Sequence, residues 1–302
     1  MNWYTPSSDY SRTAWGGRIG LQPSSVVGKE GFFRVANCGG RSYLLDPDNG
    51  AVIIHGIQHV RPGESTAHKK AFGTRYGSEA RWSEETGKLL ADNHINYISY
   101  GSNRIEVFPA AVRGNLLTPK TQKIAYAENL YLLRTFMWDM SKNLGYAFDD
   151  DKYNRLVLLF EPTFATYIDR LVQEKSALFA GDRHFIGFYL DNELPFASYQ
   201  GTGYANTEGG GWLVHTQKNR GEFYQNFCLR LLETRNCVGW VHFEYNDGYD
   251  SNGKASNKGV VSIEYEPYES FLSQMRQLNL SVHSLIDYYD IKSVSYTHLT
   301  LP

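Results

Sequence analysis

The sequence has few cysteines, no strongly charged segment and no long apolar run, and each absence narrows what the protein can be. Its cysteines, Cys38, Cys228 and Cys237, lack metal-ligand spacing and cannot all pair, so we expect free thiols. Acidic and basic residues nearly balance, 32 against 30, and no basic run suggests nucleic acid as a partner. No segment is long and apolar enough to span a membrane, so we expect no membrane partner.

The two ends of the chain lack the usual targeting and folding signals. Met1–Gly20 is polar, so we expect no signal peptide in this chain. The localisation stays open, since a secreted or periplasmic parent can start upstream. The last nine residues, VSYTHLTLP at 294–302, match the translation of a sequencing adapter, which indicates a metagenomic assembly. We therefore expect one natural domain, residues 1–293, followed by an artefact at 294–302.

The most informative segment is HFIGFYLDNELPF, His184–Phe196, where an apolar run stops at an acidic cluster. Apolar residues occupy both alternating faces of this run, as in a parallel strand that is covered on both sides. An amphipathic helix that opens at Glu161-Pro162 precedes it, which completes a helix–strand unit. In α/β barrels the functional groups follow the carboxyl ends of strands, where Asn192 and Glu193 lie.

Alternating strand and helix patterns along the chain predict an α/β fold, a single barrel-sized domain with an N-terminal β-hairpin extension. The eightfold (β/α)8 form of that barrel is implied only by the family resemblance described below. The hairpin strands are expected at residues 31–34, 42–45 and 52–54, with a turn at 46–50. His59 and Arg61 follow directly and are candidate substrate contacts. They are equally well explained as loop residues that hold the hairpin.

Further elements complete this pattern. We expect helices at 83–92 and 222–233, the latter with Phe223, Phe227 and Leu231 on its buried face. Strands are expected at 95–100, 123–126 and 238–245, and a closing helix follows Pro267, with a buried face formed by Phe271, Leu272, Met275 and Leu278.

Several blocks, in order, resemble agarase-type glycoside hydrolases, which are retaining enzymes of clan A with TIM barrels. The blocks are residues 32–62, the FYLDNELPF strand, GWLVHTQKNRGEFYQNF from Gly211, VGWVHFEYNDG from Val238 and NKGVVSIEYEPY from Asn257. The resemblance implies hydrolysis of β-glycosidic bonds in a galactose-containing algal polysaccharide, and that mechanism needs no cofactor. No histidine and carboxylate set has metal-ligand spacing, so we expect no metal.

By the same resemblance, Glu193 is the catalytic acid and base, and Asn192 binds the sugar hydroxyl beside the reacting carbon. Without the family context, a strand-end carboxylate more simply pairs with an arginine. Retention also needs a second carboxylate, the nucleophile, which the family places at the end of the seventh strand.

That seventh strand has no counterpart in this sequence. Fewer than fifty residues separate Glu193 from Val238, whereas three strand–helix units need on the order of eighty. We therefore expect strands 5 to 7 and the nucleophile to be missing, with a join between Phe196 and Tyr204. Glu208 lies in a glycine-rich loop and is interpreted as solvated. Neither Glu244, interpreted as part of the final strand, nor Glu264 matches the nucleophile position.

The family blocks also supply candidate substrate contacts. Trp240, His242 and Asp247 come from the final strand and its end, and His215 and Gln217 precede a helix. Asn246, beside Asp247, is a further plausible polar contact. Val241 and His242 stand where relatives tend to have histidine and tryptophan. That tryptophan usually stacks under a sugar ring, so its absence puts sugar binding at this position in doubt. A core position is the commoner case for a tryptophan in such a strand, so Trp240 is also explained as a core residue. His215 and Gln217 equally mark a helix entry.

The sequence thus predicts an agarase-like retaining hydrolase with a polysaccharide or oligosaccharide substrate, in a form that is weakly active or inactive. One alternative is a non-catalytic carbohydrate-binding relic that lacks the nucleophile. Another is a clan A hydrolase of a different β-glycan. Glycan identity, endo or exo action and oligomeric state stay open.

Overall fold

The computed structural model describes residues 10–101, 108–144, 159–191, 214–249 and 255–292. The chain divides into two compact units. Unit 1 comprises Met1–Tyr126 and Leu213–Pro302, and unit 2 comprises Ala127–Trp212.

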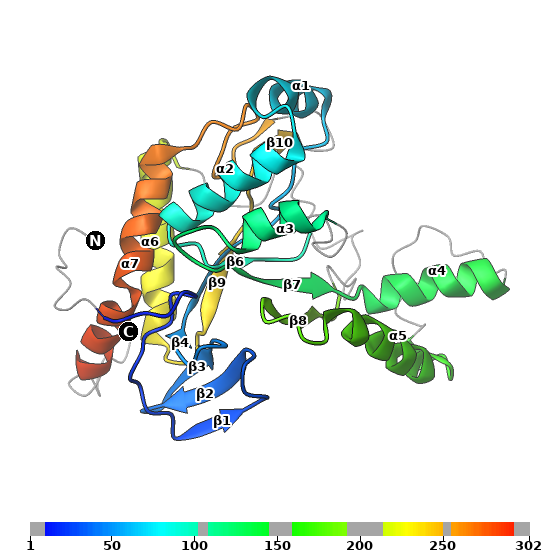
Figure 1. Cartoon of the computed structure of the whole chain (residues 1–302), viewed down its shortest axis with the longest axis horizontal. Coiled ribbons are helices and arrows are strands. Elements are labelled where there is room, and N and C mark those ends of the chain that lie inside the picture. Colours follow the sequence, from blue (N-terminus) through cyan, green and yellow to red (C-terminus); the bar gives the residue numbers. More distant parts are fainter. Residues whose placement is uncertain (1–9, 102–107, 145–158, 192–213, 250–254, 293–302) are drawn as a thin grey trace, which may run out of the picture. The chain divides into compact units, whose positions relative to one another are not determined.

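Unit 1 begins with a small antiparallel sheet in the order β1-β2-β3-β4 (Figure 1). Its strands are β1 (Ser25–Val27), β2 (Arg34–Cys38), β3 (Arg41–Leu45) and β4 (Ala51–Val52). The expected turn at 46–50 is confirmed, because Leu44 pairs with Val52 across it. The Asp46 carboxylate holds this turn by accepting hydrogen bonds from the Asp48 and Gly50 N–H groups, both at 2.9 Å. The strand expected at 31–34 starts only at Arg34, since Gly31 has a positive φ of 82°.

A parallel sheet forms the centre of unit 1. Strand β5 (Ile54–Ile57) pairs in parallel with β6 (Tyr97–Ile98) on one side and with β9 (Gly239–His242) on the other. Strand β7 (Ala125–Asn129) enters the sheet beside β6. His55, directly after the strand expected at 52–54, lies within β5. These parallel pairs confirm the α/β class, and closure into a barrel stays a prediction.

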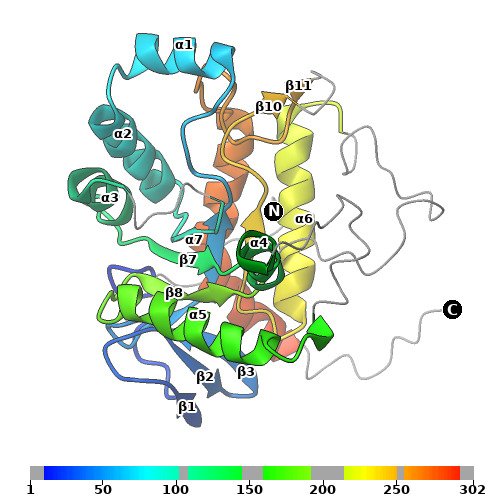
Figure 2. The same ribbon diagram turned by 90° about the vertical axis from the view of Figure 1, so that its right-hand side faces the viewer.

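Helices pack around this sheet. They are α1 (Thr66–Arg75), α2 (Glu79–Asp92), α3 (Ala110–Leu117), α6 (Gln217–Glu233) and α7 (Glu269–Lys292), and a hairpin of β10 (Gly248–Tyr249) and β11 (Ala255–Ser256) follows β9. Helices α6 and α7 run side by side (Figures 1 and 2). Helix α2 starts at Glu79, four residues before the predicted 83, because the Ser78 side chain caps the Arg81 N–H.

The buried faces of α6 and α7 test the sequence patterns. The α7 prediction is confirmed, since Phe271, Leu272, Met275 and Leu278 are all buried. The α6 prediction is wrong, because Phe223 and Phe227 are 42% and 58% exposed. The buried residues of α6 are shifted by one position, to Tyr224, Cys228 and Leu232 among others. Both faces of α6 carry apolar side chains, so hydrophobic periodicity alone did not show which face is buried.

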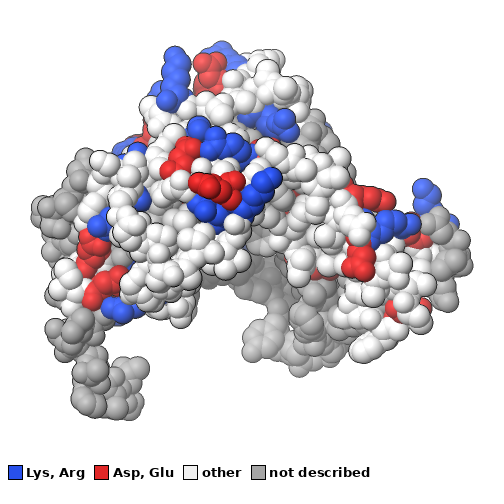
Figure 3. Space-filling view, turned by 60° about the horizontal axis from the view of Figure 1, so that its bottom comes forward, with Lys and Arg blue, Asp and Glu red and all other residues white. Residues whose placement is uncertain are grey.

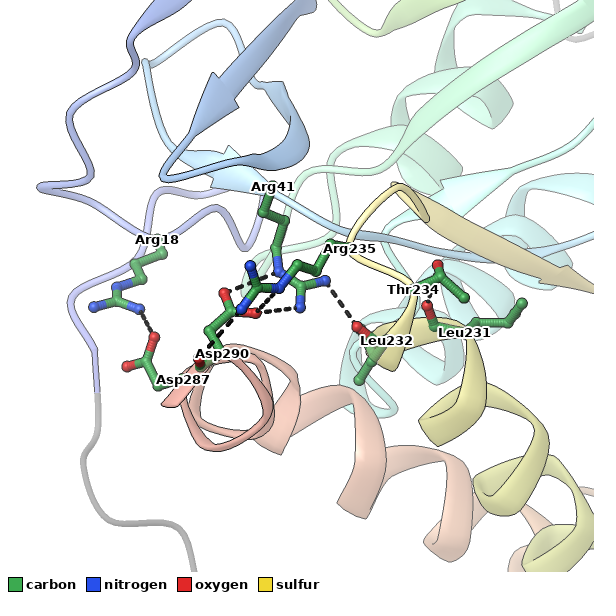
Figure 4. Close-up of polar contacts among 8 residues, drawn as sticks. All are labelled: Arg18, Arg41, Leu231, Leu232, Thr234, Arg235, Asp287 and Asp290. Carbon is green, nitrogen blue, oxygen red and sulfur yellow. Dashed lines mark hydrogen bonds and ion pairs between the residues drawn. The ribbon is translucent and has the colours of Figure 1, made fainter. Parts of the chain in front are cut away.

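Charged residues join the ends of α6 and α7 to the N-terminal sheet (Figure 4). The fully buried Arg41 guanidinium donates to both carboxylate oxygens of Asp290, at 3.1 and 2.7 Å, and to the Leu232 carbonyl at 2.8 Å. Arg235 adds a second ion pair to Asp290 at 3.2 Å, and Arg18 pairs with Asp287 at 2.7 Å. A buried guanidinium needs this full set of acceptors, so the network fixes the register of α7.

Unit 2 contains the rest of β7, β8 (Phe185–Tyr189), α4 (Leu132–Leu144) and α5 (Phe164–Phe179). Strand β8 lies next to β7. The core of α4 is formed by Leu133, Phe136, Met137 and Met140, against which Phe164 and Tyr167 of α5 pack. The expectation that β8 is covered on both faces is wrong, since its residues are only half-buried and Leu190 is 64% exposed.

Candidate functional site

A pocket of about 370 Å³ lies in unit 1, beyond the carboxyl ends of β5 and β9. The loop after β5, the start of α1, the segment after β9 and Lys258, which follows β11, form its walls. The lining residues are Arg61, Gly63, Glu64, Ser65, His68, Phe243, Glu244, Asn246, Asp247, Gly248 and Lys258. The carboxyl edge of a parallel sheet is where α/β proteins place their ligands.

Glu244 and His59 form a pair at this edge. The sequence had placed Glu244 within the final strand. Strand β9 ends at His242, so Glu244 lies just past the strand instead. The Glu244 carboxylate is 2.9 Å from His59 Nδ1. His59 has a positive φ of 56°, and its ring packs so closely on Gly101 that a Cβ there would lie 2.4 Å from it. The backbone on both sides is tied down, because Tyr245 N–H donates to the Gln58 carbonyl at 3.0 Å.

Asp247 is held by internal bonds. Its carboxylate accepts from the Gly259 N–H at 2.7 Å and from the Tyr268 hydroxyl at 2.5 Å. Burial raises the pKa of Asp247, and these hydrogen bonds counteract that rise. Both carboxylate oxygens are therefore engaged in holding the loop after β9 against the segment that follows β11.

Asn246 differs from its neighbour. It is 7% exposed and lines the pocket, yet its side-chain nitrogen has no hydrogen-bond partner among the described residues. An unsatisfied buried donor costs roughly 1–3 kcal/mol. Such a group calls for an explanation, and an external acceptor in the pocket is one.

The start of α1 closes one side of the pocket. Ser65 caps the helix by accepting from the His68 N–H at 3.2 Å. His68 Nε2 donates to the Asp247 carbonyl at 2.7 Å, because a carbonyl can only accept, and Nδ1 therefore accepts from the Ser65 hydroxyl at 2.8 Å. Gly63 is required here, since a Cβ would lie 2.2 Å from the His68 ring. The arrangement is a rigid helix entry.

The Lys258 carbonyl anchors the opposite wall. It accepts from the Glu244 N–H at 3.1 Å, from His242 Nε2 at 3.0 Å and from the Arg220 guanidinium of α6. The Arg220 guanidinium also lies over the Phe271 ring, 4.3 Å from its centroid. Burial, and then the charge of Arg220, lowers the pKa of His242 to about 4. His242 is thus a neutral donor at ordinary pH.

The predicted contacts divide by their distance from this pocket. Arg61 and Asp247 line it, and His59 bonds to a lining residue. Trp240 is buried with its indole N–H donating to the Tyr224 hydroxyl at 2.5 Å, which matches the core alternative. His242 lies behind the wall, bonded as described above.

The two remaining candidates of unit 1 lie at the start of α6. Gln217 is the first residue of that helix and donates to the Asn257 side chain at 2.8 Å. His215 is exposed, one residue before the capping Thr216. Both positions match the helix-entry alternative that the sequence left open.

Asn192, Glu193 and Glu208, as well as the expected join at 196–204 and the tail at 294–302, lie outside the described residues. The last described residue before them is Asp191, whose carboxylate accepts from the Leu133 N–H of α4 at 2.9 Å. The catalytic roles of Asn192 and Glu193 stay predictions.

Sequence reasoning found Asn246 as a plausible polar contact but missed other pocket residues, namely Phe243, Lys258, His68 and, as a pocket residue, Glu244. The available signal was the end of β9. Had the strand been ended at His242, the residues from Phe243 onward would have been placed at the functional edge of the sheet.

Among the described residues, no group of three or more histidine, cysteine, aspartate or glutamate side chains is arranged to hold a metal ion. No helix within the described ranges has the length and apolar character to cross a membrane. On the face shown in Figure 3, lysine and arginine side chains lie next to aspartate and glutamate, without a field of one sign.

The fold resembles solved structures. BpGH50 matches with a TM-score of 0.75 and 18% identity, over 95% of this chain and 90% of that one. AgWH50C, an agarase, matches with a TM-score of 0.54 and 12% identity, over 91% and 66%. An exo-beta-agarase matches with a TM-score of 0.56 and 11% identity, over 91% and 68%. No family model matches the chain, and no curated protein sequence matches it significantly. At these identities the likeness shows the fold alone: an α/β architecture with a parallel sheet, common to this chain and to structures that include agarases.

Proposed function

We propose that this protein derives from an agarase-like glycoside hydrolase acting on agar-type polysaccharide. The observation that carries the proposal is the likeness over nine-tenths or more of the chain to structures that include two agarases. The pocket supports it, because it lies at the carboxyl edge of the parallel sheet and combines carboxylates, an amide and an aromatic ring.

The proposed mechanism is double displacement with retention. Glu193 protonates the leaving oxygen and then deprotonates water, and Asn192 binds the adjacent hydroxyl. The fold proposed for the parent is a TIM barrel. In this chain we propose that strands 5 to 7 are absent, together with the nucleophile, so that hydrolysis is weak or lost.

The test compares the whole chain with Glu193→Gln on agarose and its oligosaccharides, measuring released reducing ends. If Glu193 is the acid and base, the substitution lowers the rate at which reducing ends are released by a factor of about 100 or more. Glu208→Gln is the matched control, because it removes a carboxylate from the same stretch of chain without a proposed role. Equal activity in the wild type and Glu193→Gln would rule out the assigned role.

A second candidate is a carbohydrate-binding relic. It is favoured by the position of the pocket, whose described lining residues all belong to unit 1. Agarose binding that persists in Glu193→Gln, with no reducing ends from either form, would support the relic. Release of sugar from a β-mannan or β-glucan, but not from agarose, would instead show that the substrate assignment is wrong.

The proposed deletion has its own test. Sequencing long reads of the source DNA across the codons for Phe196–Tyr204 will show whether three strand–helix units and a strand-end glutamate are missing from this chain. A continuous natural junction would make the relic the better explanation.

A further inference from the structure

We propose that Glu244 and Asn246 together bind one hydroxyl group of a neutral sugar ring in the unit 1 pocket, with Phe243 lying against the ring. This inference rests on the proposed carbohydrate function and names the side chains that carry it out. Of the three, only Asn246 was a plausible contact from the sequence; Glu244 and Phe243 were not.

Asn246 supplies the donor. Its side-chain nitrogen is shielded from solvent and unpartnered among the described residues, although the residue lines the pocket. The neighbouring Asp247 has both carboxylate oxygens engaged by Gly259 and Tyr268. The fold therefore satisfies one of two adjacent polar side chains and leaves the other's donor available for a ligand oxygen.

Glu244 supplies the acceptor. A carboxylate offers about four lone-pair sites, and the bond to His59 Nδ1 at 2.9 Å uses one of them. The Glu244 main chain is held in place, because its N–H donates to the Lys258 carbonyl at 3.1 Å, and the bond to His59 orients the carboxylate. A hydroxyl group both donates and accepts, so an amide N–H and a carboxylate on the same wall complement it.

Phe243 supplies an apolar surface. Its ring is 42% exposed and lines the pocket, with the His59 ring edge-on at 5.0 Å and Lys258 Nζ 5.7 Å from its centroid. Exposing an aromatic ring to water is unfavourable. The C–H face of a sugar ring covers such a surface while its hydroxyls reach polar neighbours.

The charges of the pocket favour a neutral occupant. Its lining contains three carboxylates, Glu64, Glu244 and Asp247, against Arg61 and Lys258. The Arg61 guanidinium is already paired with Glu64 at 3.1 Å. A sulfate group on the sugar would therefore meet the Glu244 carboxylate, which pairs with His59 and with no lysine or arginine among the described residues.

The test is calorimetric titration of the full chain with an agarose tetrasaccharide and with its sulfated counterpart. We expect the wild type to prefer the neutral sugar, and Glu244→Gln to weaken neutral binding about tenfold, the equivalent of one charged hydrogen bond, while reducing discrimination against sulfate. Glu64→Gln, in the same pocket but exposed and paired with Arg61, is the control and should bind as the wild type does.

Asn246→Leu separates ligand binding from a structural role. Replacing an unsatisfied buried amide by an apolar side chain of similar shape should preserve or raise the melting temperature, while binding falls about tenfold or more. A fall in melting temperature with unchanged affinity would overturn the inference.

The outcomes also distinguish this inference from the proposed function. If the wild type binds the agarose tetrasaccharide and both variants bind it equally well, the inference fails and the proposed function stands. If the wild type binds a neutral mannan or glucan oligosaccharide instead, the agar assignment fails, and weaker binding of that sugar by both variants would support the inference. Binding of no neutral sugar would overturn it.

Discussion

The two sides of the segment Gly239–Asn246 show how one stretch of chain serves both fold and site. On one side, Trp240 and His242 contact α6 and α7, and their ring N–H groups have internal acceptors. On the other, Val241 and Phe243 are partly exposed, and the chain continues to an amide donor without a partner at Asn246. Complete internal bonding indicates a structural role, whereas an unsatisfied donor beside a pocket indicates a binding role.

The largest expected effect comes from the side of this segment that packs against α6 and α7, here called the packed side. Trp240→Ala removes a buried ring and its bond to Tyr224, so we expect a loss of about 3–5 kcal/mol in the free energy of unfolding. Val241→Ala, on the other side of the same strand, should cost less than about 1 kcal/mol. Chemical denaturation measures both, and equal losses would show that the two sides do not differ.

Acid should weaken the packed side next. Burial lowers the pKa of His242 from 6.5 to about 4, so the unfolded chain takes up a proton first as the pH falls. The stabilisation is complete above about pH 6.5 and is lost progressively towards pH 4, by about 3 kcal/mol for a shift of this size. In denaturation curves measured across this range, His242→Gln should reduce the pH dependence, and the exposed His215→Gln should leave it unchanged. The remaining slope is expected from His55 and His283, because burial lowers the pKa of each to about 3. The same slope in His242→Gln would locate the titration elsewhere.

Arg220→Gln tests the link between the two sides, because Arg220 bonds to the Lys258 carbonyl behind the pocket. Removing this buried donor should cost about 1–3 kcal/mol in unfolding free energy. Lys218→Gln, an exposed residue of the same helix, is the matched control. Thermal and chemical unfolding measure both variants. An unchanged unfolding free energy in Arg220→Gln would show that the bond from Arg220 to the Lys258 carbonyl is dispensable.

The smallest change in unfolding free energy is expected at the exposed rim of the pocket, formed by Arg61 and Glu64. Glu64→Gln breaks an exposed ion pair with Arg61, so the change in unfolding free energy should stay below about 0.5 kcal/mol. A larger loss in the same denaturation assay would mean that the rim contributes to the fold and would weaken the contrast between the two sides.

Prediction from the sequence succeeded where one pattern had one explanation. The turn at 46–50 contains Asp46 and Gly50 at the positions that such a turn requires, and it was placed correctly. The closing helix was placed with its buried face, because its large apolar residues recur with helical spacing. It failed on α6, where aromatic residues occupy both faces and only packing against α7 decides which one is buried.

Prediction of the site residues also succeeded only where the sequence pattern had one explanation. Arg61 and Asp247 were found because polar residues after a strand mark the functional edge of a sheet. Asn246 was likewise a plausible contact just past the strand, but Glu244 was not found, because the length of β9 depends on its pairing with β5, which stops at His242. Local propensity across VGWVHFEY continues for three more residues and gives no sign of that end.

The sequence by itself determined the α/β class, the order of the principal strands and helices, and the polar edge after β5 and β9, because these depend on local periodicity and on turn residues. Only the tertiary structure decided which polar side chains are consumed internally. Trp240, His242 and Asp247 find partners that lie far along the chain or across the sheet, while the Asn246 amide does not. Hydrogen-bond satisfaction is a property of three-dimensional neighbours, so no one-dimensional pattern contains it.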